Sequence, residues 1–150
     1  MEKIVEVIRI KQEVQEVQEK YEFLKDFQIK SPDTLISAIR KLIGDEDREI
    51  LLVLSLNMKN KIVAVHRCHV GSLNASIVHP REVFKSAILN NAASIVMAHN
   101  HPSFDPTPST EDIDVTKRIV EAGSILGIEL LDHVIVGDKE GISLRQKGFM

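Results

Sequence analysis

Apolar and polar positions alternate along the chain in blocks that predict strands separated by helices. The run 50–56 is almost entirely apolar, as is typical of a strand that is buried on both faces. Residues 62–70 follow it after a short turn, so the two segments are predicted to form a hairpin. Further strands are predicted over 93–98, 128–136 and 142–144.

Three helices are predicted between or before these strands. Ser31 is a typical N-cap, and Gly44 ends the helix that begins there. A second helix begins at Pro80, and its predicted inward side chains are Val83, Phe84, Ala87 and Ile88. A third begins at Ser109 and ends at Gly127. The alternation predicts an α/β domain with a mixed β-sheet flanked by helices.

The first 30 residues form an arm whose structure the pattern leaves open. β-Branched residues over 3–10 favour a strand, whereas apolar residues spaced by three and four from Val7 to Leu24 favour one face of a helix. Such an arm could pair with a second copy and produce a homo-oligomer. We therefore expect two parts, an arm over 1–30 and a domain over 31–150.

Composition and charge narrow the function classes. The 150 residues are 43% hydrophobic and suffice for one buried core, while the net charge of −3 does not support nucleic-acid binding. Cys68 is the single cysteine, which excludes an intramolecular disulfide and favours a reducing compartment. No apolar run approaches the roughly 20 residues that cross a membrane, and the charged N-terminus does not fit a signal peptide. We expect a cytoplasmic protein without membrane association.

Two histidines carry the strongest chemical signal. His99 and His101 are two residues apart, and Pro102 favours extended backbone before it, so both imidazoles are expected on one side. A loop with prolines could return Asp112, in the first turn of the following helix, toward them. Two imidazoles and one carboxylate match the three protein ligands of a catalytic zinc site, with a fourth position for water.

A structural role competes for part of this set. Ser109 and Asp112 have the spacing of a capping box, in which both side chains accept hydrogen bonds from backbone N–H groups. On spacing alone, the cap and the metal ligand are equally good interpretations of Asp112. A site that activates water also needs a general base, most simply a carboxylate that does not bind the metal.

The other histidines have ordinary roles as alternatives. His66 and His69 flank Cys68 on a predicted strand, where their opposite parity predicts opposite faces and disfavours a second metal site. His79 and His133 either orient site residues or make structural hydrogen bonds. Cys68 is expected to be a small packed residue.

The string from His99 to Asp112 resembles the RadC family of the JAB/MPN superfamily. The superfamily's metalloprotease (JAMM) motif is His-x-His, seven residues, Ser, two residues, Asp, which His99, His101, Ser109 and Asp112 match with the spacing intact. The resemblance continues through 71–74, 78–84 and 131–133. It covers roughly residues 45–149.

The resemblance implies a cytidine-deaminase-like α/β fold and a zinc ion held by His99, His101 and Asp112. It also implies that Ser109 helps to stabilise an oxyanion. JAB metalloproteases cleave peptide or isopeptide bonds, so a peptide or an isopeptide-linked substrate is expected. The alternative function is a non-catalytic RadC-like binding module in DNA repair or in a protein assembly.

The general base that the family requires is a glutamate upstream of the histidines. Glu49 directly precedes the apolar run 50–56 and matches the family's position, with Glu82 as the alternative. Glu111 lies nearer to the ligands but at the exposed start of a helix.

The sequence departs from the family's pattern at two places. Phe104 stands where many RadC-like sequences have glycine, and a phenylalanine is not expected to adopt a positive φ. The loop is therefore predicted to differ, or Phe104 to face the cleft as an apolar substrate contact. The first 44 residues are also too few for the helical domain that precedes this one in longer family members.

Overall fold

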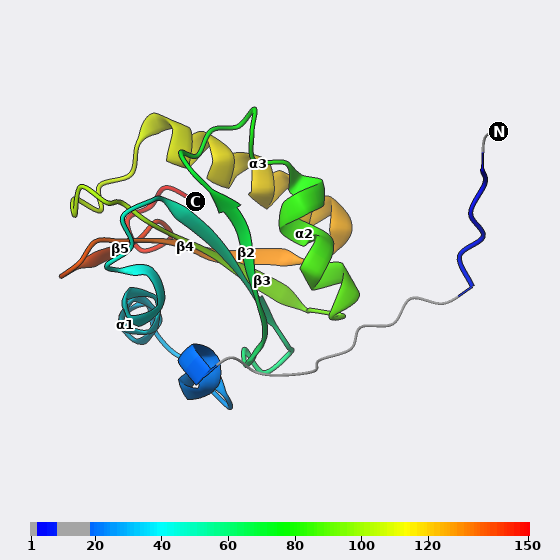
Figure 1. Cartoon of the computed structure of the whole chain (residues 1–150), viewed down its shortest axis with the longest axis horizontal. Helices are drawn as coiled ribbons and strands as arrows, with labels where there is room; N and C mark the ends of the chain where they lie inside the picture. The colour runs from blue at the N-terminus through cyan, green and yellow to red at the C-terminus, as the bar shows by residue number, and fades with distance from the viewer. Residues whose placement is uncertain (1–2, 9–18) are drawn as a thin grey trace.

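A five-stranded sheet with helices on both faces forms the centre of the computed structural model, which describes residues 3–8 and 19–150 (Figure 1). The elements are the 3₁₀ helix η1 (Glu19–Leu24), α1 (Pro32–Ile43), β1 (Ile50–Leu56), β2 (Ile62–Val70), α2 (Pro80–Leu89), β3 (Ser94–Asn100), α3 (Thr110–Leu126), β4 (Glu129–Val136) and β5 (Gly141–Ser143). The predicted α/β class with a mixed sheet is confirmed.

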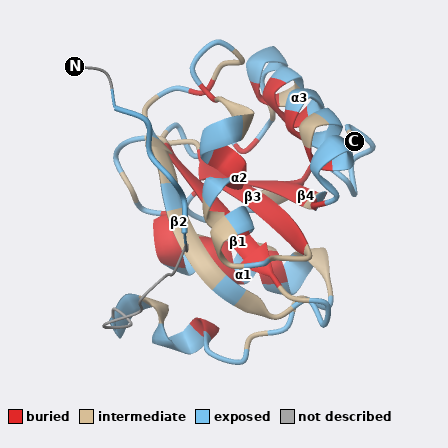
Figure 2. Cartoon of the chain, turned by 90° about the vertical axis from the view of Figure 1, so that its right-hand side faces the viewer, coloured by how far each residue is buried: buried red, intermediate tan, exposed pale blue. Residues whose placement is uncertain are grey.

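The strand order is β2-β1-β3-β4-β5, and β3 and β4 are the parallel pair in an otherwise antiparallel sheet. β1 and β2 form the predicted hairpin. Its turn closes on the side-chain oxygen of Asn57, which accepts hydrogen bonds from the N–H groups of Lys59 and Lys61. β1 has a strand on each edge and helices over both faces, so all its residues are buried (Figure 2). This burial explains its continuous apolar sequence.

Alternate strand residues fill two hydrophobic layers, one on each side of the sheet. The layer beneath α1 includes the strand residues Leu52, Leu54, Val96 and Ala98. The layer beneath α2 and α3 includes Leu51, Val53, Ile95 and Met97. His99 continues the second series and Asn100 the first. The end of β3 therefore directs two neighbouring polar side chains to opposite faces of the sheet.

The helix termini follow the sequence signals. Ser31 is the N-cap of α1 and accepts a hydrogen bond from the Thr34 N–H, and Gly127 ends α3 with a left-handed φ of +74°. The predicted inward position of Ile88 is wrong, because its side chain is 53% exposed. Ile88 lies at an apolar groove between α2 and α3 that also includes Phe84 and Ile125.

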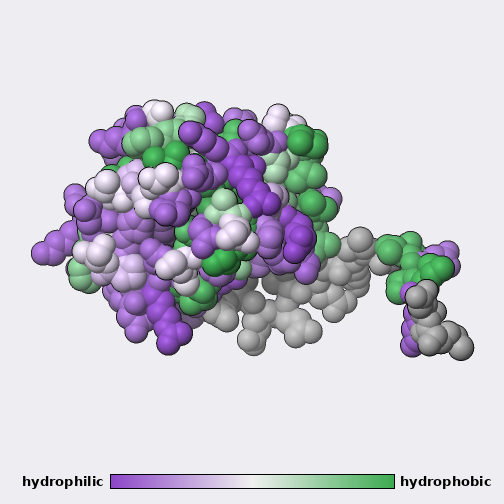
Figure 3. All heavy atoms as spheres, turned by 90° about the horizontal axis from the view of Figure 1, so that it is seen from above, coloured by the Kyte–Doolittle hydropathy of each residue, from purple (hydrophilic) through white to green (hydrophobic). Residues whose placement is uncertain are grey.

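The N-terminal arm is described in part. Residues 3–8 form neither helix nor strand, so the expected strand is not seen there, and 9–18 lie outside the described residues. Residues 3–8 expose four apolar side chains (green at the N-terminal end in Figure 3), namely Ile4, Val5, Val7 and Ile8. From η1 onward the chain joins the core, where Leu24 is buried. Over 3–8 and 19–150, no helix combines the length and apolar character needed to span a membrane.

Candidate metal centre

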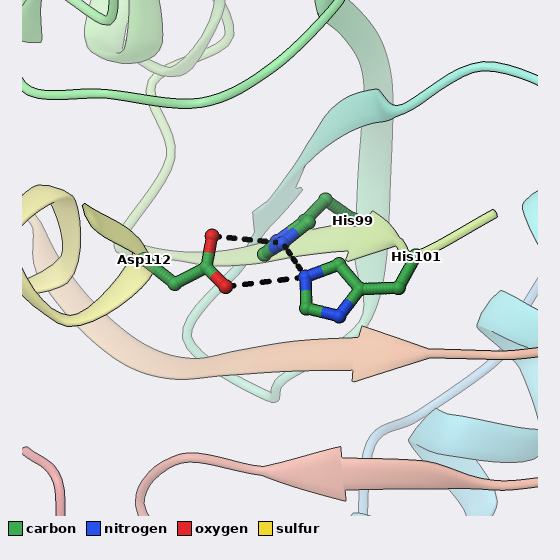
Figure 4. A group of neighbouring side chains, drawn as sticks. All are labelled: His99, His101 and Asp112. Carbon is green, nitrogen blue, oxygen red and sulfur yellow. Dashed lines mark hydrogen bonds and ion pairs between the residues drawn. The ribbon is translucent and has the colours of Figure 1, made fainter. Parts of the chain in front are cut away.

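His99, His101 and Asp112 form one cluster between the carboxyl end of β3 and the first turn of α3 (Figure 4). The two Nε2 atoms are 3.0 Å apart. Oδ1 of Asp112 lies 3.2 Å from Nε2 of His99, and Oδ2 lies 3.1 Å from Nε2 of His101. Of the residues that the structure describes, these are the ones grouped closely enough to hold a metal ion together. The structure thus brings together all three predicted ligands.

The spacing of these atoms fits a single metal ion. Ligands at about 2.0–2.1 Å from a tetrahedral zinc ion lie about 3.3 Å from one another, close to the 3.0–3.2 Å observed here. The side chains of His99 and Asp112 are buried, whereas that of His101 is 12% exposed, so solvent reaches the cluster beside His101. Nitrogen and oxygen donors of this kind suit zinc and other divalent transition-metal ions.

Asp112 belongs to the capping box and to the cluster at the same time. Its Oδ2 accepts a hydrogen bond from the Ser109 N–H at 2.8 Å, and Oγ of Ser109 accepts one from the Asp112 N–H at 3.1 Å. The cap fixes the orientation of the carboxylate, whose Oδ1 faces His99. The two interpretations of the sequence are therefore not alternatives, because the cap holds the candidate ligand in place.

Opposite charges stabilise each other within the cluster. Burial by itself raises the pKa of Asp112, but hydrogen bonds with His101 and His99 outweigh it and hold that pKa well below its usual range. The hydrogen bond with Asp112 raises the pKa of His101 against the opposing effect of burial, aided by the Asp105 carbonyl and the charge of Glu49. The site therefore favours a positive charge, whether a proton or a metal ion.

A second layer of buried polar groups lies behind His99. His133 on β4 places Nε2 2.7 Å from Nδ1 of His99, and its Nδ1 is 2.6 Å from Oγ1 of Thr116 on α3. Burial lowers the pKa of His133 well below the ordinary histidine value. The contact with His99 favours the orienting role for His133. Sequence reasoning missed Thr116, although its position four residues after Asp112 places both on one face of α3.

Asn100 joins the end of β3 to the segment that carries Glu49. Its buried Oδ1 accepts a hydrogen bond from the Ile50 N–H at 2.7 Å, and its Nδ2 donates to the Arg48 carbonyl at 2.8 Å. These bonds hold the backbone on both sides of Glu49, which is half-buried just before β1. The charge of Glu49 contributes to the raised pKa of His101, so Glu49 lies within electrostatic reach of the cluster.

The other acidic candidates lie on exposed positions. Glu82 is in the first turn of α2, and its charge, together with the larger effect of burial, raises the pKa of the Cys68 thiol to about 11. Glu111 is exposed at the start of α3. Among these three glutamates, Glu49 is the one whose charge contributes to the pKa of a cluster residue.

Phe104 adopts the backbone conformation that the sequence argues against. Its φ is +68°, in the left-handed region, and its N–H donates to the carbonyl of His101 at 2.9 Å. The expectation that phenylalanine would avoid a positive φ is therefore wrong. The turn is held from outside, because the Phe104 carbonyl packs so closely on Gly137 that a Cβ there would be 2.5 Å from its oxygen. The Phe104 side chain is 56% exposed.

His66 and His69 do not lie on opposite faces of β2, so that prediction is wrong. The register pairs His66 with Val53 and His69 with Leu51, which share one face of β1. A bulge at Cys68 adds one residue to β2 between the histidines, so both side chains face the same side of the sheet despite their odd spacing. Neither histidine belongs to a potential metal group in the described part of the chain.

A family model described as a RadC-like JAB domain matches residues 29–149. This match spans the ligand cluster, the segment of Glu49 and the buried layer behind His99. The chain belongs to the RadC-like JAB domain family. The resemblance inferred from the string between His99 and Asp112 is thereby confirmed.

Proteins named UPF0758 are similar to this RadC-like chain. One from Caldanaerobacter subterraneus subsp. tengcongensis is 55% identical over 125 residues, which are 83% of this chain and 54% of the relative. Another from Desulforamulus reducens is 50% identical over 122 residues, 81% of this chain and 54% of the relative. One from Geobacillus thermodenitrificans is 59% identical over 103 residues, which are 69% of this chain and 46% of the relative. The chain spans about half the length of these curated relatives.

Proposed function

We propose that this chain is a zinc-dependent hydrolase of the JAB metalloprotease type, which cleaves an amide bond in a peptide or isopeptide-linked substrate. The observation that carries the proposal is the cluster of His99, His101 and Asp112, whose ligand atoms lie within 4.8 Å of one another in a RadC-like JAB domain. A zinc ion held there would polarise the scissile carbonyl and lower the pKa of a bound water to roughly 7.

Glu49 takes the role of general base. Its carboxylate accepts a proton from the attacking water and delivers that proton to the nitrogen of the leaving amine. Two observations support this assignment: its charge acts on His101, and Asn100 anchors the backbone on both sides of it. Glu82 has neither of these relations to the ligand cluster.

Ser109 takes the role of oxyanion donor. Its Oγ accepts a hydrogen bond from the Asp112 N–H, which leaves its own O–H to donate to the developing negative charge on the substrate oxygen. The same hydrogen bond fixes the hydroxyl one turn from the ligand carboxylate. Ser109 therefore combines the helix cap with a catalytic donor.

Metal content and turnover test this function separately. We expect one zinc ion per wild-type chain at neutral pH and none in the variant His99→Ala/His101→Ala. With fluorogenic peptide and isopeptide-linked substrates, Glu49→Gln should retain zinc and lose turnover by about 10²–10⁴-fold. Glu82→Gln, the matched control at an exposed position, should retain both. Folded wild-type protein that excludes zinc would overturn the proposal, and unchanged turnover in Glu49→Gln would remove Glu49 from its role.

A further inference from the structure

Behind the candidate ligand cluster, a chain of hydrogen bonds connects His99 through His133 and Thr116 to the backbone of α3, and each donor in it points away from His99. We propose that Thr116 and His133 are positioning residues that fix which nitrogen of His99 carries a proton, so that Nε2 presents a lone pair to a metal ion. This inference rests on the metal site of the proposed function. The number of hydrogens that Thr116, His133 and His99 can each donate determines which atom is the donor in every hydrogen bond.

The first step is the hydroxyl of Thr116, which is fully buried on α3. It donates its single hydrogen to the backbone carbonyl of Asp112, one turn earlier in the helix, at 2.7 Å. A threonine hydroxyl has one hydrogen to donate and lone pairs to accept with. Toward Nδ1 of His133, 2.6 Å away, Thr116 therefore acts as an acceptor. His133 must carry a hydrogen on Nδ1.

The second step is the imidazole of His133. The ring is fully buried, and its two nitrogens are hydrogen-bonded to His99 and Thr116, neither of which is an anion. In a neutral imidazole one ring nitrogen carries the hydrogen and the other accepts a hydrogen bond. Nε2 of His133 is therefore unprotonated, and it accepts a hydrogen bond from Nδ1–H of His99 at 2.7 Å.

The third step is His99 itself. With Nδ1 held by His133, Nε2 is the nitrogen that a metal ion can bind in place of the hydrogen bond to Asp112, whose Oδ1 lies 3.2 Å away. His101 reaches the same arrangement directly, because its Nδ1 faces the carbonyl of Asp105 at 2.8 Å and a carbonyl can only accept. Both histidines thus direct Nε2 to the same point, one through a backbone carbonyl and the other through His133 and Thr116.

This chain of hydrogen bonds, which we call the relay, begins and ends at Asp112. The backbone carbonyl of Asp112 takes the hydrogen of Thr116, while the carboxylate of Asp112 faces Nε2 of His99. One turn of α3 therefore supplies a candidate ligand and determines the protonation of a second. Removing the hydroxyl of Thr116 leaves Nδ1–H of His133 without its acceptor, so that His133 can instead protonate at Nε2 and reverse the direction of the relay.

Nitrogen-15 NMR of the imidazoles in the metal-depleted 150-residue chain gives the first test. We expect protons on Nδ1 of His99 and His133 and none on Nε2 of His133. The variant Thr116→Val, nearly the same size, should show mixed tautomers of His133, while Thr116→Ser, which keeps the hydroxyl, should match the wild type. A wild-type His133 with its proton on Nε2 would overturn the inference, and this measurement needs no variant to fold.

Competition with a zinc chelator gives the second test. We expect Thr116→Val to weaken zinc binding by about 10–100-fold in Kd, and Thr116→Ser to stay within about twofold of the wild type. Unfolding midpoints of both variants provide the control for a loss of structure. Wild-type zinc affinity in folded Thr116→Val would contradict the inference. If the wild type itself binds no zinc, the proposed function fails, whereas the tautomers of the metal-depleted protein still decide the relay.

Discussion

The variant Asn100→Ala tests how the fold delivers Glu49 to the ligand cluster. Asn100 is 1% exposed, and its amide bridges the N–H of Ile50 and the carbonyl of Arg48. Leaving the buried Ile50 N–H without a partner costs about 1–3 kcal/mol, and losing the more exposed bond to Arg48 costs about 0.5–1.5 kcal/mol. We expect the free energy of unfolding to fall by about 2–4 kcal/mol.

The same variant should affect catalysis more than metal binding. The segment of Glu49 loses its hydrogen bonds to the Asn100 side chain, and a displacement of about 1 Å in a catalytic group can reduce turnover about 100-fold. The ligand side chains face the opposite side of the sheet from Asn100 and keep their own contacts. We therefore expect zinc content to remain near the wild-type value while kcat falls about 10–100-fold.

Denaturant unfolding, zinc content and turnover of Asn100→Ala are best measured beside Asn90→Ala. Asn90 makes a comparable amide bond to the Ser86 carbonyl, at 2.7 Å, at the end of α2. Its loss should cost about 1 kcal/mol of stability and leave turnover unchanged. The reasoning is refuted if Asn100→Ala keeps wild-type kcat, or if its stability loss is no larger than that of Asn90→Ala.

Two further predictions concern pH and the loop at Phe104. The raised pKa of His101 contributes stability below about pH 6.5, and this contribution is lost as the pH rises through the pKa of His101 in the folded chain. The lowered pKa of Asp112 contributes stability above about pH 4, and this contribution is lost as the pH falls through the pKa of Asp112 in the folded chain. In denaturant unfolding of the metal-free chain, His101 and Asp112 should therefore contribute most to the free energy of unfolding between about pH 4 and 6.5. Zinc affinity should instead increase with pH, because His101 loses the proton that competes with the metal ion. Zinc affinity that is independent of pH from 5 to 8 would contradict this. Phe104→Gly relieves about 1–2 kcal/mol of left-handed strain and loses about 0.4–1 kcal/mol through the more flexible unfolded chain. We expect a net gain of about 0.5 kcal/mol in urea unfolding, and a loss above 1 kcal/mol would show that the exposed ring makes a stabilising contact.

Local patterns were sufficient to predict most elements of the domain and the candidate metal ligands. The apolar run of β1, the N-cap Ser31 and the C-terminal Gly127 act over a few residues, so their effect is visible in the sequence. The proximity of His99 and His101 also follows from extended backbone over two residues. Together with the preserved family spacing to Asp112, these signals predicted the cluster of His99, His101 and Asp112, which the structure brings close enough to hold a metal ion.

Tertiary structure alone decided what depends on contacts between distant segments. The bulge at Cys68 moved His69 to the face of His66, because strand register is set by the partner strand. Packing against Gly137 held Phe104 at a positive φ against its own preference. Asn100 and the layer behind His99 acquire their roles across 17–52 residues of sequence, since their hydrogen-bond partners lie on distant segments of the chain. The sequence determined which side chains could bind a metal ion; the packing of β3, β4 and α3 decided how they are held.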